Sequence, residues 1–362
     1  MDYPREKGGV RPRMKQRGVF LIGLILITVY YFLFPRGSGK EIIVSPDSLT
    51  ILELTDSAVS PSSIPASVVR NGSNTGYLDS DHELLTLFQA ERMAADRHWI
   101  AVSGDDGLSL MEPDGRLISR IQDSGYPIVR NGQLFLYRND SGILSKINPQ
   151  NGRYLWSMEY ISAITVLDGI PGKTLVGLLD GRVELIDDSG KVLLKYRPGG
   201  SRVEAVYGGA LSGDGSKIAL ISGLDPQRFV LLEERKNGYR PVAHHDTDTD
   251  FRRLVSIDFI RHDGQVLYEN NGFVNAVNLN GYGIHPLRFS GRLMNVIDNP
   301  VNDTLLLFGK DDGKDSIKIL TWKDRTLFES SLPSDTAEIV RDRDYTLIVT
   351  GNSIAVLEFS VR

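Results

Sequence analysis

The feature that most constrains this chain of 362 residues is a set of short apolar runs that recur at a nearly constant spacing. Seven such runs, each close behind a turn-forming segment, begin at Trp99, Leu134, Leu175, Ile218, Val266, Leu305 and Leu347. Their starts are separated by 35, 41, 43, 48, 39 and 42 residues, about 41 on average. A repeat of about 40 to 45 residues is the length of one four-stranded blade, so the spacing predicts a ring of repeated sheets.

Each apolar run is followed by two further alternating segments joined by glycine turns. In the first unit, residues 108–111 lead through the turn at 113–115 to residues 117–121. Such turns between segments of period two indicate β-hairpins, because glycine supplies the positive φ that a tight turn requires. No long apolar period of 3.6 residues follows residue 82. The predicted fold class is therefore all-β, a seven-bladed β-propeller over residues 82–362.

The end of the chain predicts how the ring closes. The last unit stops at Arg362 after three alternating segments, the third at residues 354–359. We expect residues 84–88 to add the missing fourth strand beside them, so that an N-terminal strand closes the last blade. Closure of this kind leaves the ring without an open edge.

The N-terminal part predicts a membrane anchor. Residues 18–34 contain no charged residue and, at about 1.5 Å per residue, are just long enough for a transmembrane helix. Residues 1–17 hold six Lys/Arg residues, which predicts a basic cytoplasmic tail. A cleaved signal peptide is the alternative, since small residues follow at 37–39.

Residues 35–81 are rich in Ser, Pro and Gly, which predicts a stalk between the anchor and the propeller. Two apolar patches in it, at 42–44 and 51–54, are candidates for local strands. The tripeptide Asn71-Gly72-Ser73 fits a glycosylation pattern.

Composition excludes several classes of protein. The chain has no cysteine, which rules out disulfides, cysteine zinc sites and thiol nucleophiles. The net charge is −5 although the N-terminus is basic, so the remaining body is acidic and we expect no nucleic-acid partner.

Residues 147–156, with the sequence INPQNGRYLW, resemble the repeat of quinoprotein-like (PQQ-like) propellers, and residues 185–191 and 110–116 are weaker copies. In that family the tryptophan commonly packs between blades, which is the role the resemblance implies for Trp156. Members that bind a quinone use neighbouring cysteines, which are absent here, so we expect no quinone and no other cofactor. The chain is also similar in outline to WD40 propellers but lacks their Gly-His and Trp-Asp signatures. It is thus interpreted as a non-catalytic member of this superfamily.

The strongest cluster of polar side chains is His244-His245-Asp246-Thr247-Asp248-Thr249-Asp250. Strand alternation would place Asp246, Asp248 and Asp250 on one face, and their oxygen atoms suit Ca²⁺ or Mg²⁺. These three residues are the candidate metal ligands, and a solvated loop between blades is the alternative. Neither a Gly-x-Ser-x-Gly nor a His-Glu-x-x-His motif occurs, so no catalytic residue is predicted.

These features together predict a single-pass protein of the bacterial inner membrane, held through residues 18–34, with a cytoplasmic N-terminus and a periplasmic propeller. The expected function is a protein-binding or scaffolding module with a partner in the envelope, because a closed ring presents a broad and rigid surface. The alternatives are a propeller-type enzyme, such as a glycosidase, lyase or hydrolase with its site in the central channel, and a ligand sensor.

Overall fold

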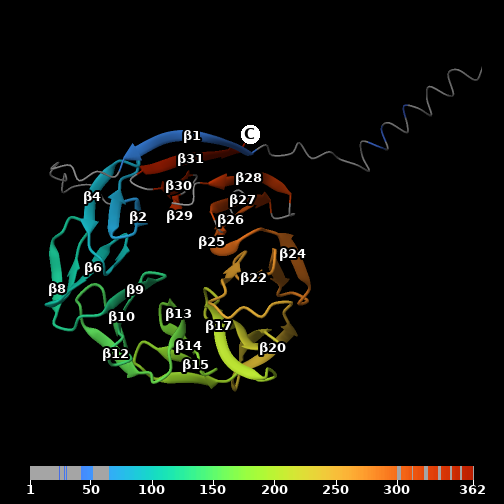
Figure 1. Cartoon of the computed structure of the whole chain (residues 1–362), viewed down its shortest axis with the longest axis horizontal. Coiled ribbons are helices and arrows are strands. Elements are labelled where there is room, and N and C mark those ends of the chain that lie inside the picture. Colours follow the sequence, from blue (N-terminus) through green and yellow to red (C-terminus); the bar gives the residue numbers. More distant parts are fainter. Residues whose placement is uncertain are drawn as a thin grey trace, which may run out of the picture. The chain divides into compact units, whose positions relative to one another are not determined.

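The computed structural model describes residues 24, 28, 30, 42–51, 65–299, 303–311, 313–321, 325–332, 336–342, 345–350 and 353–361. Within these residues, eight sheets form a ring, seven with four strands and one with three (Figure 1). The sheets lie in the compact unit of residues 44–360, apart from the first two residues of β1 and the last residue of β31; a second unit takes in residues 1–43 and 361–362. The all-β propeller is confirmed, but the number of seven blades is wrong.

The first sheet consists of β2 (Ser67–Asn71), β3 (Asn74–Leu78) and β4 (Leu84–Gln89). The next three, each written from its inner to its outer strand, are β5 (Met93–Asp96), β6 (Trp99–Gly104), β7 (Gly107–Met111) and β8 (Leu117–Ile121); β9 (Tyr126–Arg130), β10 (Gln133–Arg138), β11 (Ile143–Ile147) and β12 (Tyr154–Glu159); and β13 (Ile164–Ile170), β14 (Lys173–Leu178), β15 (Val183–Asp187) and β16 (Val192–Tyr196).

The remaining four sheets continue around the ring in the same way. They are β17 (Val203–Leu211), β18 (Lys217–Leu224), β19 (Arg228–Arg235) and β20 (Gly238–Asp246); β21 (Ile257–Ile260), β22 (Gln265–Asn270), β23 (Phe273–Asn278) and β24 (Ile284–Arg288); β25 (Arg292–Asn299), β26 (Thr304–Asp311), β27 (Lys314–Thr321) and β28 (Thr326–Leu332); and β29 (Thr336–Asp342), β30 (Tyr345–Thr350), β31 (Ser353–Val361) and β1 (Ile42–Ile51).

The seven recurring apolar runs are the second strands of the seven four-stranded sheets. The unpredicted sheet, β2 to β4, lies mostly in the segment expected to be a stalk. Its second strand, β3, reads NTGYL and so lacks an apolar run. Gly72 and Ser73 form the turn between β2 and β3, where Gly72 has a φ of +57°, whereas the sequence suggested only a glycosylation pattern there.

The ring closes as expected, but through a different segment. β1 pairs with β31 and completes the last sheet, and the two lie side by side in Figure 1. Residues 84–88, predicted to close the ring, instead lie in β4 and pair with β3. The apolar patch at 42–44 therefore belongs to the closing strand, because its chain position before β2 leaves it free to pair with the C-terminal strand.

The predicted transmembrane helix lies outside the described residues except for Leu24, Thr28 and Tyr30. The described part of the chain contains no helix that is long and apolar enough to span a membrane. This finding contradicts both the predicted anchor at residues 18–34 and the localisation as a single-pass inner-membrane protein.

The core lies between neighbouring sheets. Trp156 on β12 is 6% exposed and packs with Phe135 of its own sheet and with Val176 and Ile186 of the next. Gly190 has a φ of +85°, and a Cβ atom there would lie 2.9 Å from Cβ of Trp156. The turn after β15 therefore passes close against the Trp156 side chain. The role of Trp156 between blades is thereby confirmed.

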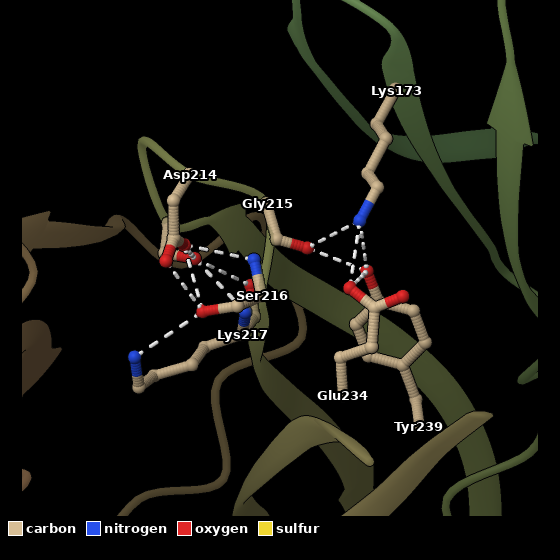
Figure 2. A network of polar contacts seen from close by, with 8 residues as sticks. Lys173, Asp214, Gly215, Ser216, Lys217, Glu234 and Tyr239 are labelled. Carbon is tan, nitrogen blue, oxygen red and sulfur yellow. Dashed lines mark hydrogen bonds and ion pairs between the residues drawn. The ribbon is translucent and has the colours of Figure 1, made fainter. Parts of the chain in front are cut away.

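Polar contacts add to the packing between sheets. Figure 2 shows the Lys173 ammonium group, at the start of β14, reaching the next sheet. It donates to the carbonyl oxygen of Gly215 at 3.0 Å, to Glu234 Oε2 at 2.9 Å and to the Tyr239 hydroxyl at 2.8 Å. An ammonium group has three donors, so this lysine is fully used in joining two sheets. Burial lowers its pKa, but the hydrogen bonds to Tyr239 and Glu234 outweigh burial and raise it.

Candidate functional site

A pocket of about 320 Å³ lies between two adjacent sheets, β17–β20 and β21–β24. One side is the end of β20 and the segment after it, with His245, Asp246 and Asp248. The other side comes from β22, β23 and β24, and its residues are Tyr268, Asn270, Phe273, Asn275, Ile284 and Pro286. The volume is near the lower end of the range of about 300 to 1,000 Å³ for ligand pockets, which suits a side chain or small group.

The segment 247–251 is shaped by one buried residue, Gln227. The Gln227 carbonyl oxygen accepts hydrogen bonds from the backbone N–H of Thr247 at 2.8 Å and from its hydroxyl at 3.0 Å. The Gln227 side chain donates to the Phe251 carbonyl at 3.0 Å and accepts from the Thr249 hydroxyl at 2.8 Å. These bonds hold the segment after Asp246 in a loop, and β20 ends at Asp246, so the predicted strand does not continue through Asp250.

The base of the pocket combines aromatic rings with polar atoms. His245 stacks on Phe229, with ring centroids 4.9 Å apart, and Phe229 also stacks on Tyr268. Nε2 of His245 lies 2.9 Å from the Tyr268 hydroxyl, and the Asn275 amide donates to the same hydroxyl at 2.7 Å. Burial lowers the pKa of His245, which favours a neutral imidazole that accepts a hydrogen bond from Tyr268. This part of the pocket is therefore preorganised and uncharged.

The mouth of the pocket carries charge. Arg228 Nε donates to Asp246 Oδ1 at 3.2 Å, and its Nη2 lies 2.8 Å from His244 Nδ1. Asp248 is exposed and adds a second carboxylate at the mouth. Since Arg228 offsets one of the two carboxylates, these three side chains leave one negative charge. Phe273 and Ile284, 38% and 44% exposed, supply apolar walls beside it.

The structure brings together two of the three candidate metal ligands. Asp246 and Asp248 line the pocket, whereas Asp250 is not among the lining residues. In the described part of the chain, no group of three or more His, Asp or Glu side chains is placed to hold a metal ion. The metal site at Asp246, Asp248 and Asp250 stays a prediction.

Sequence reasoning missed the half of the pocket that the next sheet supplies. The sequence places Tyr268 only in the apolar run that begins at Val266, and it predicts no function for Asn275. The available signal was Asn275 itself, which stands in the middle of the apolar strand β23 and is 7% exposed. A buried amide needs hydrogen-bond partners, so its presence in a strand indicates a polar neighbour across the interface.

A second group of carboxylates, near the inner strands, has mainly a structural role. Asp168 accepts a hydrogen bond from the backbone N–H of Leu211, and Asp298 accepts one from the backbone N–H of Arg261. Both distances are 2.8 Å, and each bond joins two neighbouring sheets. Burial and then the charges of Asp168, Asp298 and Asp263 raise the pKa of Asp258 to about 7. The Asp258 side chain is exposed, but the surrounding inner strands limit its hydration.

Comparisons with known proteins agree with this architecture. A family model described as "beta-propeller protein" matches residues 11–361. An uncharacterised protein of Treponema pallidum (strain Nichols) is 25% identical over 202 residues, which is 55% of this chain and 53% of that protein. The chain thus spans about half the length of this curated relative.

Solved structures are similar in fold at low sequence identity. BamB from Moraxella catarrhalis superposes with a TM-score of 0.60 at 13% identity, and the computationally designed Ika8 protein with a TM-score of 0.60 at 12% identity. Each match covers 88% of this chain and all of the other. The finer resemblance to quinoprotein-like or WD40 propellers stays a prediction. Because the family match extends over nearly the whole chain and the ring of sheets has the same architecture, this chain belongs to the family of beta-propeller proteins.

Proposed function

We propose that this propeller is a non-catalytic protein-binding module, and that it receives a lysine or arginine side chain of its partner in the pocket between β20 and β22–β24. The observation that carries the proposal is the pairing of an acidic mouth with apolar walls. Asp248 is exposed at the mouth, while Phe273 and Ile284 expose apolar surface beside it. A lysine or arginine has an apolar stem and a cationic end, so it matches both features.

The rigid base supports recognition rather than reaction. Tyr268 is held by Asn275 and His245, and the histidine is held in turn by stacking on Phe229. Groups that are already ordered lose little conformational entropy when a partner binds. The aromatic ring of Phe273 beside the mouth also favours a cation, because the face of an aromatic ring attracts positive charge.

The test uses peptides, because the partner is unidentified. A random peptide library is selected against the folded chain, and the selected peptides are measured by calorimetry. We expect them to contain Lys or Arg, and replacement of that residue by norleucine to weaken binding about tenfold or more, the effect of about 1.4 kcal/mol from a charge-assisted hydrogen bond.

The matched variants are Asp248→Asn and Asp250→Asn. Both residues are exposed on the same loop, but only Asp248 lines the pocket. Asp248→Asn is expected to weaken binding about as much as norleucine does, and Asp250→Asn to leave it unchanged. Equal effects of the two variants, or selected peptides without a basic residue, would overturn the proposal.

A further inference from the structure

The outer edge of the three-stranded sheet differs from the outer edges of the other seven. Each of those sheets ends in a fourth strand, whereas within the described residues no strand pairs with the outer side of β4. In Figure 1, β4 lies farther from the centre of the ring than β2, where the other sheets carry their fourth strands. Within the described residues, the outer backbone groups of β4 therefore lack a strand partner, which makes this edge a template for another strand.

The sequence of β4 lacks charged residues and proline, two of the usual protections of an edge. Natural edge strands carry charged residues, proline or bulges that discourage pairing with another chain. The outermost strand of each four-stranded sheet contains at least one charged residue; these include Arg120, Glu159, Lys195, Arg240, Arg288, Glu329 and Asp47. β4 reads LLTLFQ and contains none.

The edge of β4 is held in place before any partner binds. Leu84 and Leu87 pack against one core cluster, and Leu85 and Phe88 pack against another. β4 is also paired with β3 in one regular register from Thr86 to Gln89, and again at Leu84 after a register shift at Leu85. A strand fixed on both faces and on one edge presents its remaining edge as a rigid template, which limits the entropy lost on pairing.

The backbone direction shows which groups point outward. The N–H of Ala90 donates to the Ser73 carbonyl at 2.8 Å, so it points toward β3. In an antiparallel pair these directions alternate, and Thr75 stands opposite Phe88 in the same register. The N–H groups of Thr86 and Phe88 therefore also face β3, and those of Leu87 and Gln89 face outward.

From this open edge we infer that β4 binds an extended segment of a partner protein as the fourth strand of its sheet. Strand addition draws its affinity from backbone hydrogen bonds and its selectivity from alternate side chains. An uncharged edge of six residues favours an uncharged partner strand of alternating apolar residues, since a charge there would lose hydration without gaining a partner.

Charges beside β4 define the end of the partner strand. Asp81 and Glu83 are exposed just before β4 begins. The C-terminal end of an antiparallel partner strand lies at this place, so a basic residue there is complementary. A second copy of this chain is less complementary, because the segment after its own β4 carries Glu91 next to Arg92 and so brings no net positive charge toward these carboxylates. The partner segment is therefore an apolar strand followed by Lys or Arg.

The probe is a peptide of eight residues, with alternating valine and threonine followed by two lysines, and its control has two glutamates instead. Hydrogen exchange of the full chain is measured with and without peptide. We expect the lysine peptide to slow exchange of the Leu87 and Gln89 amides at least tenfold, while those of Thr86 and Phe88 are slow in both samples. The glutamate peptide is expected to bind at least tenfold more weakly.

Two substitutions separate the backbone from the side chain. Leu87→Pro removes an outward N–H without removing a bond to β3, and Leu87→Ala controls for the lost side chain. We expect Leu87→Pro to weaken binding of the lysine peptide at least tenfold relative to Leu87→Ala. If Leu87→Pro does not fold, the exchange measurement on the unmodified chain decides.

Three results would overturn the inference. The first is protection of the Leu87 and Gln89 amides without peptide, which would mean that another part of the chain covers the edge. The others are no added protection with the lysine peptide, or equally strong binding of the lysine and glutamate peptides. The outcome is independent of the pocket, because Asp248→Asn is expected to leave strand addition unchanged.

Discussion

β4 and β19 are both the third strands of their sheets, and both are mainly apolar, yet they differ in burial. β19 contains Phe229, Val230, Leu231 and Leu232, all of which are at most 3% exposed. In β4, residues 84–88 are all only partly buried. The difference lies in the neighbour, since β20 covers the outer edge of β19 and no described strand covers that of β4. Burial of a third strand therefore depends on the fourth strand as well as on its own composition.

The largest effect that tests this comparison comes from matched leucine truncations. Leu232→Ala in β19 removes a side chain that is 0% exposed, and we expect it to lower the free energy of unfolding by about 3 kcal/mol. Leu87→Ala in β4 removes a half-buried side chain and is expected to cost about half as much, because less apolar surface leaves water on folding. Denaturant unfolding of both variants measures the difference. Equal losses would show that β4 is as buried as β19 and would contradict the comparison.

A smaller effect tests how the three-stranded sheet is joined to the ring. Tyr77 on β3 is 0% exposed, and its hydroxyl lies 2.8 Å from the carbonyl oxygen of Trp99 and 3.0 Å from that of Asp96. Burial, and then the charge of Asp96, raise the pKa of Tyr77, so the hydroxyl stays protonated and acts as a donor. Tyr77→Phe is expected to lower the free energy of unfolding by about 1 to 3 kcal/mol, because a buried carbonyl loses its donor.

The control for this substitution is Tyr282→Phe, at a tyrosine that is 41% exposed. We expect it to change the free energy of unfolding by less than about 0.5 kcal/mol. If the two variants were equally stable, the hydroxyl of Tyr77 would not join the three-stranded sheet to β5–β8.

The same comparison explains which parts of the fold the sequence could predict. Every four-stranded sheet has an apolar second strand, and these strands set the period of about 41 residues. β3 has only Tyr77 and Leu78 as large apolar residues, and it begins 25 residues before β6 because its sheet has no fourth strand in between. A search for a repeat of constant length therefore passes over the one sheet that departs from it. Without that sheet, β4 was the nearest available segment to close the ring.

Only one side of the candidate site could be predicted from the sequence, for a related reason. Asp246 and Asp248 are close in sequence to each other and to His245, so local pattern brings them together. Tyr268 and Asn275 meet them only through packing of one sheet on the next. Gln227 is 20 residues from Thr247, yet it holds the loop in which the metal prediction expected a strand. Contacts between sheets are not encoded in the period of a single repeat.

The smallest effect concerns the inner edges, where the two kinds of sheet are alike. Glu338 on β29 accepts a hydrogen bond from the Arg70 N–H of the three-stranded sheet at 2.6 Å, as Asp168 does from Leu211 between four-stranded sheets. Asp258 differs from these carboxylates, because burial and the nearby charges of Asp168, Asp298 and Asp263 raise its pKa from 3.8 to about 7. Its ionised form is therefore less favourable in the folded chain than in the unfolded chain.

Asp258→Asn removes this ionisation, and its benefit should depend on pH. Below about pH 4 the carboxyl is protonated in both states, so it contributes no pH-dependent difference. Between about pH 4 and 7 the unfolded chain loses the proton while the folded chain keeps it, so the unmodified protein loses stability relative to the variant. Above about pH 7 the variant is expected to melt higher by roughly one or two degrees, a small gain because water reaches the side chain. Thermal unfolding across this range measures the gain in melting temperature. The control is Asp105→Asn, which replaces a fully exposed carboxylate. A gain in melting temperature that is constant with pH, or that grows toward pH 4, would contradict the assignment of the raised pKa to Asp258.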